Sequence, residues 1–408
     1  MKKLFHALVT LTAICSFASC DSGDNKKLTL DYLPVQPRND AKWGFVGPNG
    51  KMLYEDEFKE IPSMVINGVF TVEEDGGISV YEATAKKPTL IPGLEELVDA
   101  GIMNDGVIPI VRKNERIKLV DKSGKEKLVL DDNVCPFEII GIEACSTDGM
   151  FIIQIYNECF GVINTSGKLL INTIFTDITY LSDNRFLGKS IKGDYLLLNN
   201  KGKEIAKFDE KMTAGSKFIK GKCLVLKGDD KIPGYINRSG EFTKLPAKIH
   251  RFTGVFDGKV FGFETEDENT GIMSVDGEVI IRPKYKMVAQ IPDDKYIVSN
   301  DDDQWFILNK NGEKETVLDD FEYIIPMSAT GFGGKFELIG AEKRHRIDLY
   351  DYKGKAITQE SFYNANLQVK KFVKSDYFSP EDIGRTLAYL IDSEGVNGVK
   401  FNTPVSRL

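Results

Sequence analysis

The ten residues Lys42–Lys51 constrain this chain more than any other stretch, because weakened copies of them return along its length. Their sequence, KWGFVGPNGK, reads as a short strand, a turn that contains glycine, and the start of a second strand. A period of this size is typical of repeat architectures, whose units bury their faces only against neighbouring units. Successive turn glycines lie 35 to 43 residues apart after one double interval of 74 residues: Gly50, Gly124, Gly167, Gly202, Gly240, Gly277, Gly312 and Gly354.

Each repeat contains four short apolar runs separated by turn residues. One copy has them at residues 218–220, 223–227, 234–237 and 242–245. Helical periodicity is absent from about residue 28 to residue 374. Residues 28–374 are therefore predicted to form an all-β domain, a β-propeller of about eight four-stranded blades, with seven to nine blades compatible with the repeats. Counted by their turn glycines, the repeats number nine.

Two other arrangements of such repeats stay open. A β-solenoid has shorter coils, and a linear array of hairpins would leave strand edges exposed. The ends of the repeat region favour closure instead. The chain opens inside a blade with the strand at 28–35 and finishes the repeats with a lone strand at 365–373, and these two pieces would complete one blade between them.

The first 19 residues form a predicted signal peptide. Lys2 and Lys3 precede an apolar run at 4–17, and two small residues stand before Cys20. This pattern resembles the lipobox of bacterial lipoproteins, in which the cysteine becomes the lipidated first residue, although Phe17 stands where Leu is commoner. An ordinary signal peptide cleaved nearby is the alternative, and the apolar run is shorter than the roughly 20 residues that span a membrane.

Residues 20–27 are polar and predict a flexible tether. Acidic residues directly after Cys20 resemble the export signal of surface lipoproteins in the Bacteroidetes group. We therefore expect a chain held by lipid on Cys20 at the bacterial outer membrane, on the cell surface or on the periplasmic side.

Residues 375–408 leave the repeat pattern. Ser379 and Pro380 are typical of a helix start, and apolar residues follow on one helical face at Ile383, Leu387, Leu390 and Ile391. The sequence predicts a short C-terminal helix that docks on the propeller or contacts a partner.

The charge of the chain argues against nucleic acid as a partner. It has 53 basic and 61 acidic residues, and removing Lys2 and Lys3 with the signal peptide leaves a net charge of about −10. Four cysteines remain beyond Cys20, at positions 135, 145, 159 and 223. Their spacing matches no zinc pattern, and buried free thiols are favoured over disulfides between Cys135 and Cys145 or Cys159.

Motifs that would identify a reaction are missing. His250 and His345 lie in no metal-ligand or nucleophile spacing. The glycine-rich segment 329–335 precedes no helix pattern and is interpreted as a hairpin loop. Acidic clusters at 131–132, 229–230, 264–268 and 301–303 lack the spacing of a calcium loop, so each is interpreted as a solvated turn. Trp43 and Trp305 are expected in the core between blades and not on a sugar-binding surface.

The segment Lys42–Lys51 resembles the WG repeat family, whose consensus runs Lys-Trp-Gly, two apolar residues, Asp, two variable residues, Gly and Lys. Residues 271–285 keep the tail of that consensus, with its proline and aromatic residue, but lack the tryptophan. The resemblance covers most of the chain and implies a structural repeat, with no activity, cofactor or ligand attached.

These observations favour a membrane-anchored, non-enzymatic β-propeller that serves as a binding or scaffold module for a protein or glycan partner. The alternative is a glycan-active enzyme with paired carboxylates in the propeller channel, brought together from distant blades. The sequence predicts no catalytic, cofactor-binding or metal-binding residue. Cys20, the lipidation site, is the one site residue that it predicts.

Overall fold

The computed structural model describes residues 30–145, 149–156, 158–246, 248–318, 321–327, 338–342, 346–368, 372–375 and 377. Throughout these residues the regular structure is β-strand, and no α-helix occurs in them. The predicted C-terminal helix lies outside the described residues. The chain divides into two compact units, which are described separately: unit 1 holds residues up to 66, 85–87 and 212–368, and unit 2 holds 67–84, 88–211 and the residues from 369 onward.

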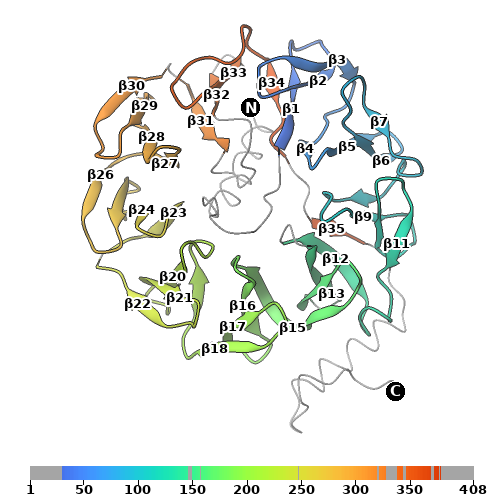
Figure 1. Ribbon diagram of the computed structural model, residues 1–408, viewed down its shortest axis with the longest axis horizontal. Coiled ribbons are helices and arrows are strands. Elements are labelled where there is room, and N and C mark those ends of the chain that lie inside the picture. Colours follow the sequence, from blue (N-terminus) through green and yellow to red (C-terminus); the bar gives the residue numbers. More distant parts are fainter. Residues whose placement is uncertain are drawn as a thin grey trace. The chain divides into compact units, whose positions relative to one another are not determined.

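Unit 1 contains five antiparallel sheets among its described residues (Figure 1). The first joins the N-terminal strands to a short strand from the end of the repeats. Its strands are β1 (Leu30–Gln36), β2 (Trp43–Val46), β3 (Met52–Phe58), β4 (Val65–Ile66) and β34 (Asn364–Ala365). The others are β19 (Met212–Ala214), β20 (Lys222–Lys227), β21 (Ile232–Asn237) and β22 (Phe242–Lys244); β23 (Arg251–Phe256), β24 (Val260–Glu264), β25 (Thr270–Ser274) and β26 (Val279–Tyr285); β27 (Met287–Ile291), β28 (Lys295–Ser299), β29 (Trp305–Leu308) and β30 (Lys314–Val317); and β31 (Tyr323–Pro326), β32 (Leu338–Glu342) and β33 (Arg346–Tyr350).

Unit 2 contains four groups of antiparallel strands among its described residues. Two of them share the long strand β15, which ends one group and begins the next. The strands are β5 (Val69–Glu74), β6 (Gly77–Glu82) and β7 (Thr89–Leu90); β8 (Asp99–Ala100), β9 (Ile108–Val111), β10 (Lys118–Val120) and β11 (Glu126–Val129); β12 (Ile139–Ala144), β13 (Met150–Ile155), β14 (Phe160–Asn164) and β15 (Leu169–Tyr180); β16 (Arg185–Ser190), β17 (Tyr195–Asn199) and β18 (Glu204–Phe208); and β35 (Phe372–Lys374).

Apart from the first sheet, where β1 lies between β2 and β4 and also pairs with β34, and from β35, which pairs with β12, the strands of each group follow one another in chain order. Neighbouring strands pair antiparallel, which is the arrangement of a propeller blade. The all-β, β-propeller class predicted from the sequence is confirmed, and the nine groups among the described strands match the upper end of the predicted range.

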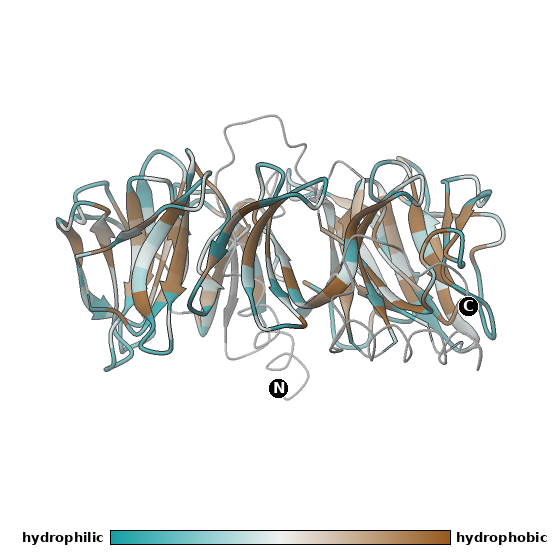
Figure 2. Cartoon of the chain, turned by 90° about the horizontal axis from the view of Figure 1, so that it is seen from below, coloured by the Kyte–Doolittle hydropathy of each residue, from teal (hydrophilic) through white to brown (hydrophobic). Residues whose placement is uncertain are grey.

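Hydrophobic clusters fill the space between successive blades within a unit. One cluster joins β23–β26 to β27–β30 through Ile272, Ile281, Val298 and Phe306, all of which are buried. Because a blade is covered on both faces, its inner strands are apolar at successive positions, as in Trp305–Leu308. Figure 2 shows hydrophobic residues along the strands and hydrophilic residues at the turns.

A recurrent bulge explains the glycine that follows the tryptophan position. Phe160 pairs with Phe175 and Val162 pairs with Ile171, so Gly161 faces three residues of β15. A Cβ on Gly161 would lie 2.7 Å from the carbonyl oxygen of Ile171. The same register joins β2 to β3 and β25 to β26, with pairs Trp43↔Phe58, Phe45↔Tyr54, Thr270↔Tyr285 and Ile272↔Ile281. The consensus glycine is therefore required by the close approach of the bulged strand.

The turn after that strand is built the same way in most repeats. The side-chain Oδ1 of Asn309 accepts the backbone N–H groups of Asn311 (2.9 Å) and Glu313 (3.0 Å), and Gly312 has a φ of 80°. This is an Asx turn that only glycine closes without strain. Six other residues accept the same two N–H groups: Asp121, Asn164, Asn199, Asn237, Asn300 and Asp351.

The predicted pairing of the two ends of the repeat region is confirmed in part. β34 pairs with β1 through Val35↔Ala365 and Gln36↔Asn364, as the closure argument requires. The rest of the predicted strand at 365–373 is wrong, because Val373 belongs to β35, which pairs with β12 in unit 2.

Candidate functional site

The buried carboxylates of the described residues are held by structural partners. Asp99 accepts the backbone N–H groups of Ala100 (2.7 Å) and Lys374 (3.0 Å). Glu138, which is 1% exposed, lies 3.7 Å from Arg116 Nη2. The other two are Glu264, bound by both Nε and Nη2 of Arg251, and Asp348, which accepts from Ser361 and pairs with Arg346. Their charges stabilise the backbone or a basic side chain, which is the ordinary use of a buried acid.

In the described residues, no three His, Cys, Asp or Glu side chains converge in the manner of a metal site. His250 is exposed, and its backbone N–H donates to the carbonyl of Glu264. His345 and the glycine-rich segment 329–335 lie outside the described residues.

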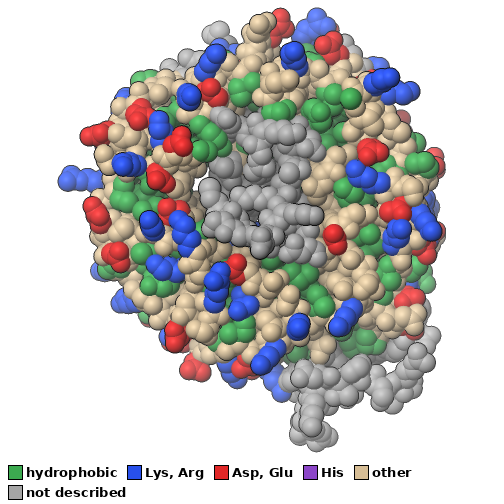
Figure 3. All heavy atoms as spheres, in the orientation of Figure 1, with side chains coloured by type: hydrophobic (Ala, Val, Ile, Leu, Met, Phe, Trp, Pro, Cys, Tyr) green, Lys and Arg blue, Asp and Glu red, His purple; other side chains and the backbone are tan. Residues whose placement is uncertain are grey.

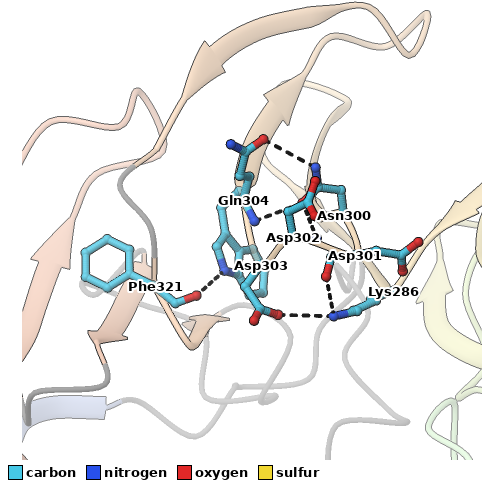
Figure 4. A network of polar contacts seen from close by, with 8 residues as sticks. Lys286, Asn300, Asp301, Asp302, Asp303, Gln304 and Phe321 are labelled. Atoms are coloured by element: carbon cyan, nitrogen blue, oxygen red, sulfur yellow. Dashed lines mark hydrogen bonds and ion pairs between the residues drawn. The ribbon is translucent and has the colours of Figure 1, made fainter.

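The acidic run at 301–303 is a turn of the repeat type (Figure 4). Asn300 Oδ1 accepts the N–H groups of Asp302 (3.1 Å) and Gln304 (2.9 Å), and Asp303 takes the positive φ that glycine has elsewhere. Lys286 Nζ donates to the carbonyl of Asp301 (2.9 Å) and to the carboxylate of Asp303 (3.2 Å). A lysine therefore stands where a calcium ion would need oxygen ligands.

The other predicted acidic turns are also placed. Asp131 Oδ1 accepts the backbone N–H of Asn133, and Asp229 and Asp230 are exposed in the hairpin between β20 and β21. In the cluster at 264–268, Glu264 is the partner of Arg251, and residues 266–268 are exposed.

The two tryptophans lie in the core, as predicted. Trp43 is 6% exposed and Trp305 is 3% exposed. The indole N–H of Trp305 donates to the carbonyl of Phe321 (3.0 Å), which ties β29 to the next blade. Neither ring is available to stack on a sugar.

The cysteines beyond Cys20 are free thiols. Cys135, Cys159 and Cys223 are buried, and Cys145 is half-buried. Burial raises the pKa of Cys135 and of Cys223 to about 12. The prediction of buried free thiols is confirmed for three of the four, and low acidity makes Cys135 and Cys223 poor nucleophiles at neutral pH.

The sheet β19–β22 differs from the rest of this acidic chain by its positive charge. Residues 212–250 contain eight Lys and Arg against three Asp and Glu. This excess of basic residues is visible in the sequence, but the Lys and Arg residues are separated from one another and form no basic run. Figure 3 shows basic and acidic side chains interspersed over the face in view, so local geometry decides which cations act together.

Three of these cations gather at one end of β19–β22, beside a fourth cation on the neighbouring hairpin. We call the four residues the basic cluster: Lys220, Lys222, Arg238 and Lys259. Lys222 opposes Asn237 in the sheet, so the turns that carry Lys220 and Arg238 lie at the same end. Lys222 Nζ donates to the carbonyl of Gly258 (3.3 Å), which precedes Lys259. A Cβ on Gly258 would lie 3.0 Å from Cβ of Lys220, so the two hairpins touch.

The acids near the basic cluster are engaged locally. Asp257 Oδ1 accepts the backbone N–H groups of Lys259 (2.7 Å) and Val260 (2.8 Å). Glu241 Oε2 accepts from the amide of Asn237 (2.6 Å). Lys220, Arg238 and Lys259 are exposed, and Lys222 Nζ lies 5.0 Å from the centre of the Tyr235 ring. The cluster thus offers exposed positive charge beside an aromatic ring, a combination suited to an anionic ligand.

Cys20 and the rest of the predicted signal peptide and tether lie outside the described residues. No described helix has the length and apolar character needed to cross a membrane.

The comparisons with known proteins agree with the repeat. The family described as "WG containing repeat" matches residues 160–187, which span β14, its bulged partner β15 and the start of β16. No curated protein sequence matches the chain.

Three solved structures resemble this chain at low sequence identity. A structure described as that of the eukaryotic initiation factor has 13% identity and a TM-score of 0.55, over 85% of this chain and 98% of the other. BamB from Moraxella catarrhalis has 11% identity and a TM-score of 0.40, over 72% and 93%. Apo AztD from Citrobacter koseri has 15% identity and a TM-score of 0.37, over 70% and 94%. The likeness to the first of these structures concerns the fold alone.

Proposed function

We propose that this chain, an all-β protein built of WG-type repeats, is a lipid-anchored and non-enzymatic binding module. Its partner is a protein or glycan whose anionic groups meet the basic cluster. The observation that carries the proposal is the convergence of Lys220, Lys222, Arg238 and Lys259 from two hairpins and a turn of an otherwise acidic chain.

The physical basis is electrostatic complementarity. Exposed cations that lie within a Debye length of one another, about 8 Å at physiological salt, add their attraction for an anionic surface. The buried carboxylates that the structure describes support the non-enzymatic part of the proposal, because each has a hydrogen-bond or ion-pair partner.

The experiment reverses the three exposed charges of the cluster. We would cross-link intact cells that carry the wild-type chain or the Lys220→Glu/Arg238→Glu/Lys259→Glu variant, and identify captured neighbours by mass spectrometry. The matched control reverses three exposed lysines elsewhere: Lys113, Lys201 and Lys310.

We expect a reproducible neighbour with the wild-type chain and the control, and loss of that neighbour with the cluster variant. Capture that is equal in all three would overturn the role of the basic cluster. An empty capture from the wild-type chain would overturn the binding module and put hydrolysis assays on glycans next.

Anchoring needs its own test, because it rests on Cys20 alone. Cys20→Ser removes the thiol that lipid would modify, so the variant should appear in the soluble fraction while the wild-type chain stays with membranes. Equal partition of both chains would contradict the lipid anchor without touching the binding proposal.

A further inference from the structure

Unit 2 contains a strand that the repeat does not require. β35 pairs antiparallel with β12 through Gly141↔Lys374, Ile142↔Val373 and Glu143↔Phe372. Ser375 continues the pairing, since its N–H donates to the carbonyl of Ile140 (2.8 Å). Among the described strands, the first strands of the comparable sheets, β8, β19, β23 and β27, end their sheets without such an addition.

The receiving edge is shaped for this segment. A side chain at Gly141 would overlap the ring of Phe372, so the absence of a side chain at this position makes room for the ring. Val373 is fully buried and Ser375 is 1% exposed, whereas the side chain of Lys374 is exposed. Val373 and Ser375 therefore point into the protein, and Lys374, between them, faces the solvent.

A buried carboxylate recognises the main chain of the segment. Asp99, on β8, is 6% exposed, and its Oδ2 accepts the backbone N–H of Lys374 (3.0 Å). Burying a carboxylate is costly unless hydrogen bonds satisfy it, and this one uses a donor from a segment 275 residues away in sequence. Ser375 Oγ adds a contact of 3.5 Å to the carbonyl of Glu115.

This geometry is that of strand addition, in which main-chain hydrogen bonds provide affinity and side-chain pockets provide specificity. We propose that the edge of β12, with Asp99 and Gly141, is a peptide-binding site for an extended segment that places an aromatic ring over Gly141. The chain's own Phe372–Ser375 is its resident ligand, and an incoming strand of the same pattern competes with it. The site is built from residues of unit 2 and the basic cluster from residues of unit 1, so each proposal is tested by its own variants.

The test measures whether the site accepts a strand from outside once its resident is weakened. The probe is a fluorescent peptide with the sequence of residues 371–377, added to the full-length protein. Phe372→Ala removes the ring that fills the place over Gly141 and leaves the receiving edge intact. We expect this variant to bind the peptide at least ten-fold more tightly than the wild-type chain.

Two further variants make the result specific. Gly141→Val combined with Phe372→Ala blocks the ring position and should abolish binding of the peptide. Lys374→Ala changes a side chain that faces solvent and should behave as the wild-type chain does. Hydrogen exchange at residues 373–375 reports in each variant whether the resident segment has been released.

Each outcome of these experiments supports or contradicts the peptide-binding site. A folded variant that releases the segment yet fails to bind the peptide overturns the proposal. If Phe372→Ala leaves the segment protected, Val373→Asp places a charge where Val373 is fully enclosed and drives it out. A segment that neither variant releases is a permanent part of the sheet, and the proposal is then wrong.

Discussion

Gly202 and the carbonyl oxygen of Leu170 approach each other so closely that a Cβ on the glycine would lie 2.8 Å from that oxygen. Gly202 closes the turn between β17 and β18, and Leu170 lies on β15, in the preceding blade. The turn glycines at positions 50, 124 and 312 approach a carbonyl of the neighbouring blade in the same way. The glycine of the repeat therefore serves two purposes: it takes a positive φ, and it allows two blades to touch.

A pair of substitutions separates these purposes. Gly193 and Gly202 lie in the same sheet with φ values of 86° and 71°, but Gly193 has open space around it. Gly193→Ala should lower the free energy of unfolding by roughly 1–2 kcal/mol, the cost of the left-handed conformation. Gly202→Ala should cost more, because the new methyl group also meets the Leu170 carbonyl. Chemical denaturation measures both, and equal losses would show that the contact between blades does not matter.

We expect Asn→Asp in the Asx turn to preserve the stability of the protein and Asn→Ala to lower it. Asn199→Asp keeps the oxygen that accepts from Lys201 and Lys203, as Asp121 and Asp351 do in their repeats. Asn199→Ala removes that acceptor and should destabilise the protein by about 1 kcal/mol. The comparison is made by thermal unfolding of the two variants. A larger loss with Asp than with Ala would contradict the hydrogen-bonding account of the repeat.

Asp121 predicts a pH-dependent contribution to stability. Lys127, and then Ser123, hold the pKa of the Asp121 carboxyl well below its usual range. A depressed folded-state pKa stabilises the protein above the unfolded value of about 3.9 and loses that effect as the pH falls toward the folded value. Asp121→Asn keeps the turn but not the charge, so its melting temperature should lie below that of the wild-type chain at pH 7.

The difference between Asp121→Asn and the wild-type chain should shrink once the pH falls below about 4. Asp230→Asn, at an exposed hairpin position, is the control for the change in net charge. A difference that stays constant from pH 7 to pH 3 would show that the charge of Asp121 does not contribute through its pKa.

The period of the turn glycines was enough to predict the fold class, because the Asx turn that marks each repeat is formed by local bonds. Gly312 and Asn309 form their turn from bonds four residues apart or fewer, so a single sequence contains the whole cause. The pairing of β34 with β1 followed from a different argument, namely that a repeat cut at both ends leaves two incomplete halves.

The candidate sites could not be predicted in this way, because they depend on distant residues. Lys222 and Lys259 are parts of one cluster only because Gly258 lets two hairpins touch. The sequence placed Val373 in the terminal blade, but it pairs with β12 instead. That pairing depends on Asp99 and on the absence of a side chain at Gly141. Neither residue carries a local sequence signal for that role.

The buried thiols give a prediction for cysteine chemistry. Cys135 and Cys223 are enclosed, and burial raises the pKa of each to about 12, so the reactive thiolate is scarce at pH 8. We expect a thiol reagent to modify Cys145, which is half-buried, before the other three. Cys135, Cys159 and Cys223 should react only when urea unfolds the chain. Mass spectrometry of modified peptides measures the order, and rapid modification of Cys223 in the folded protein would show that its sheet opens more easily than its burial implies.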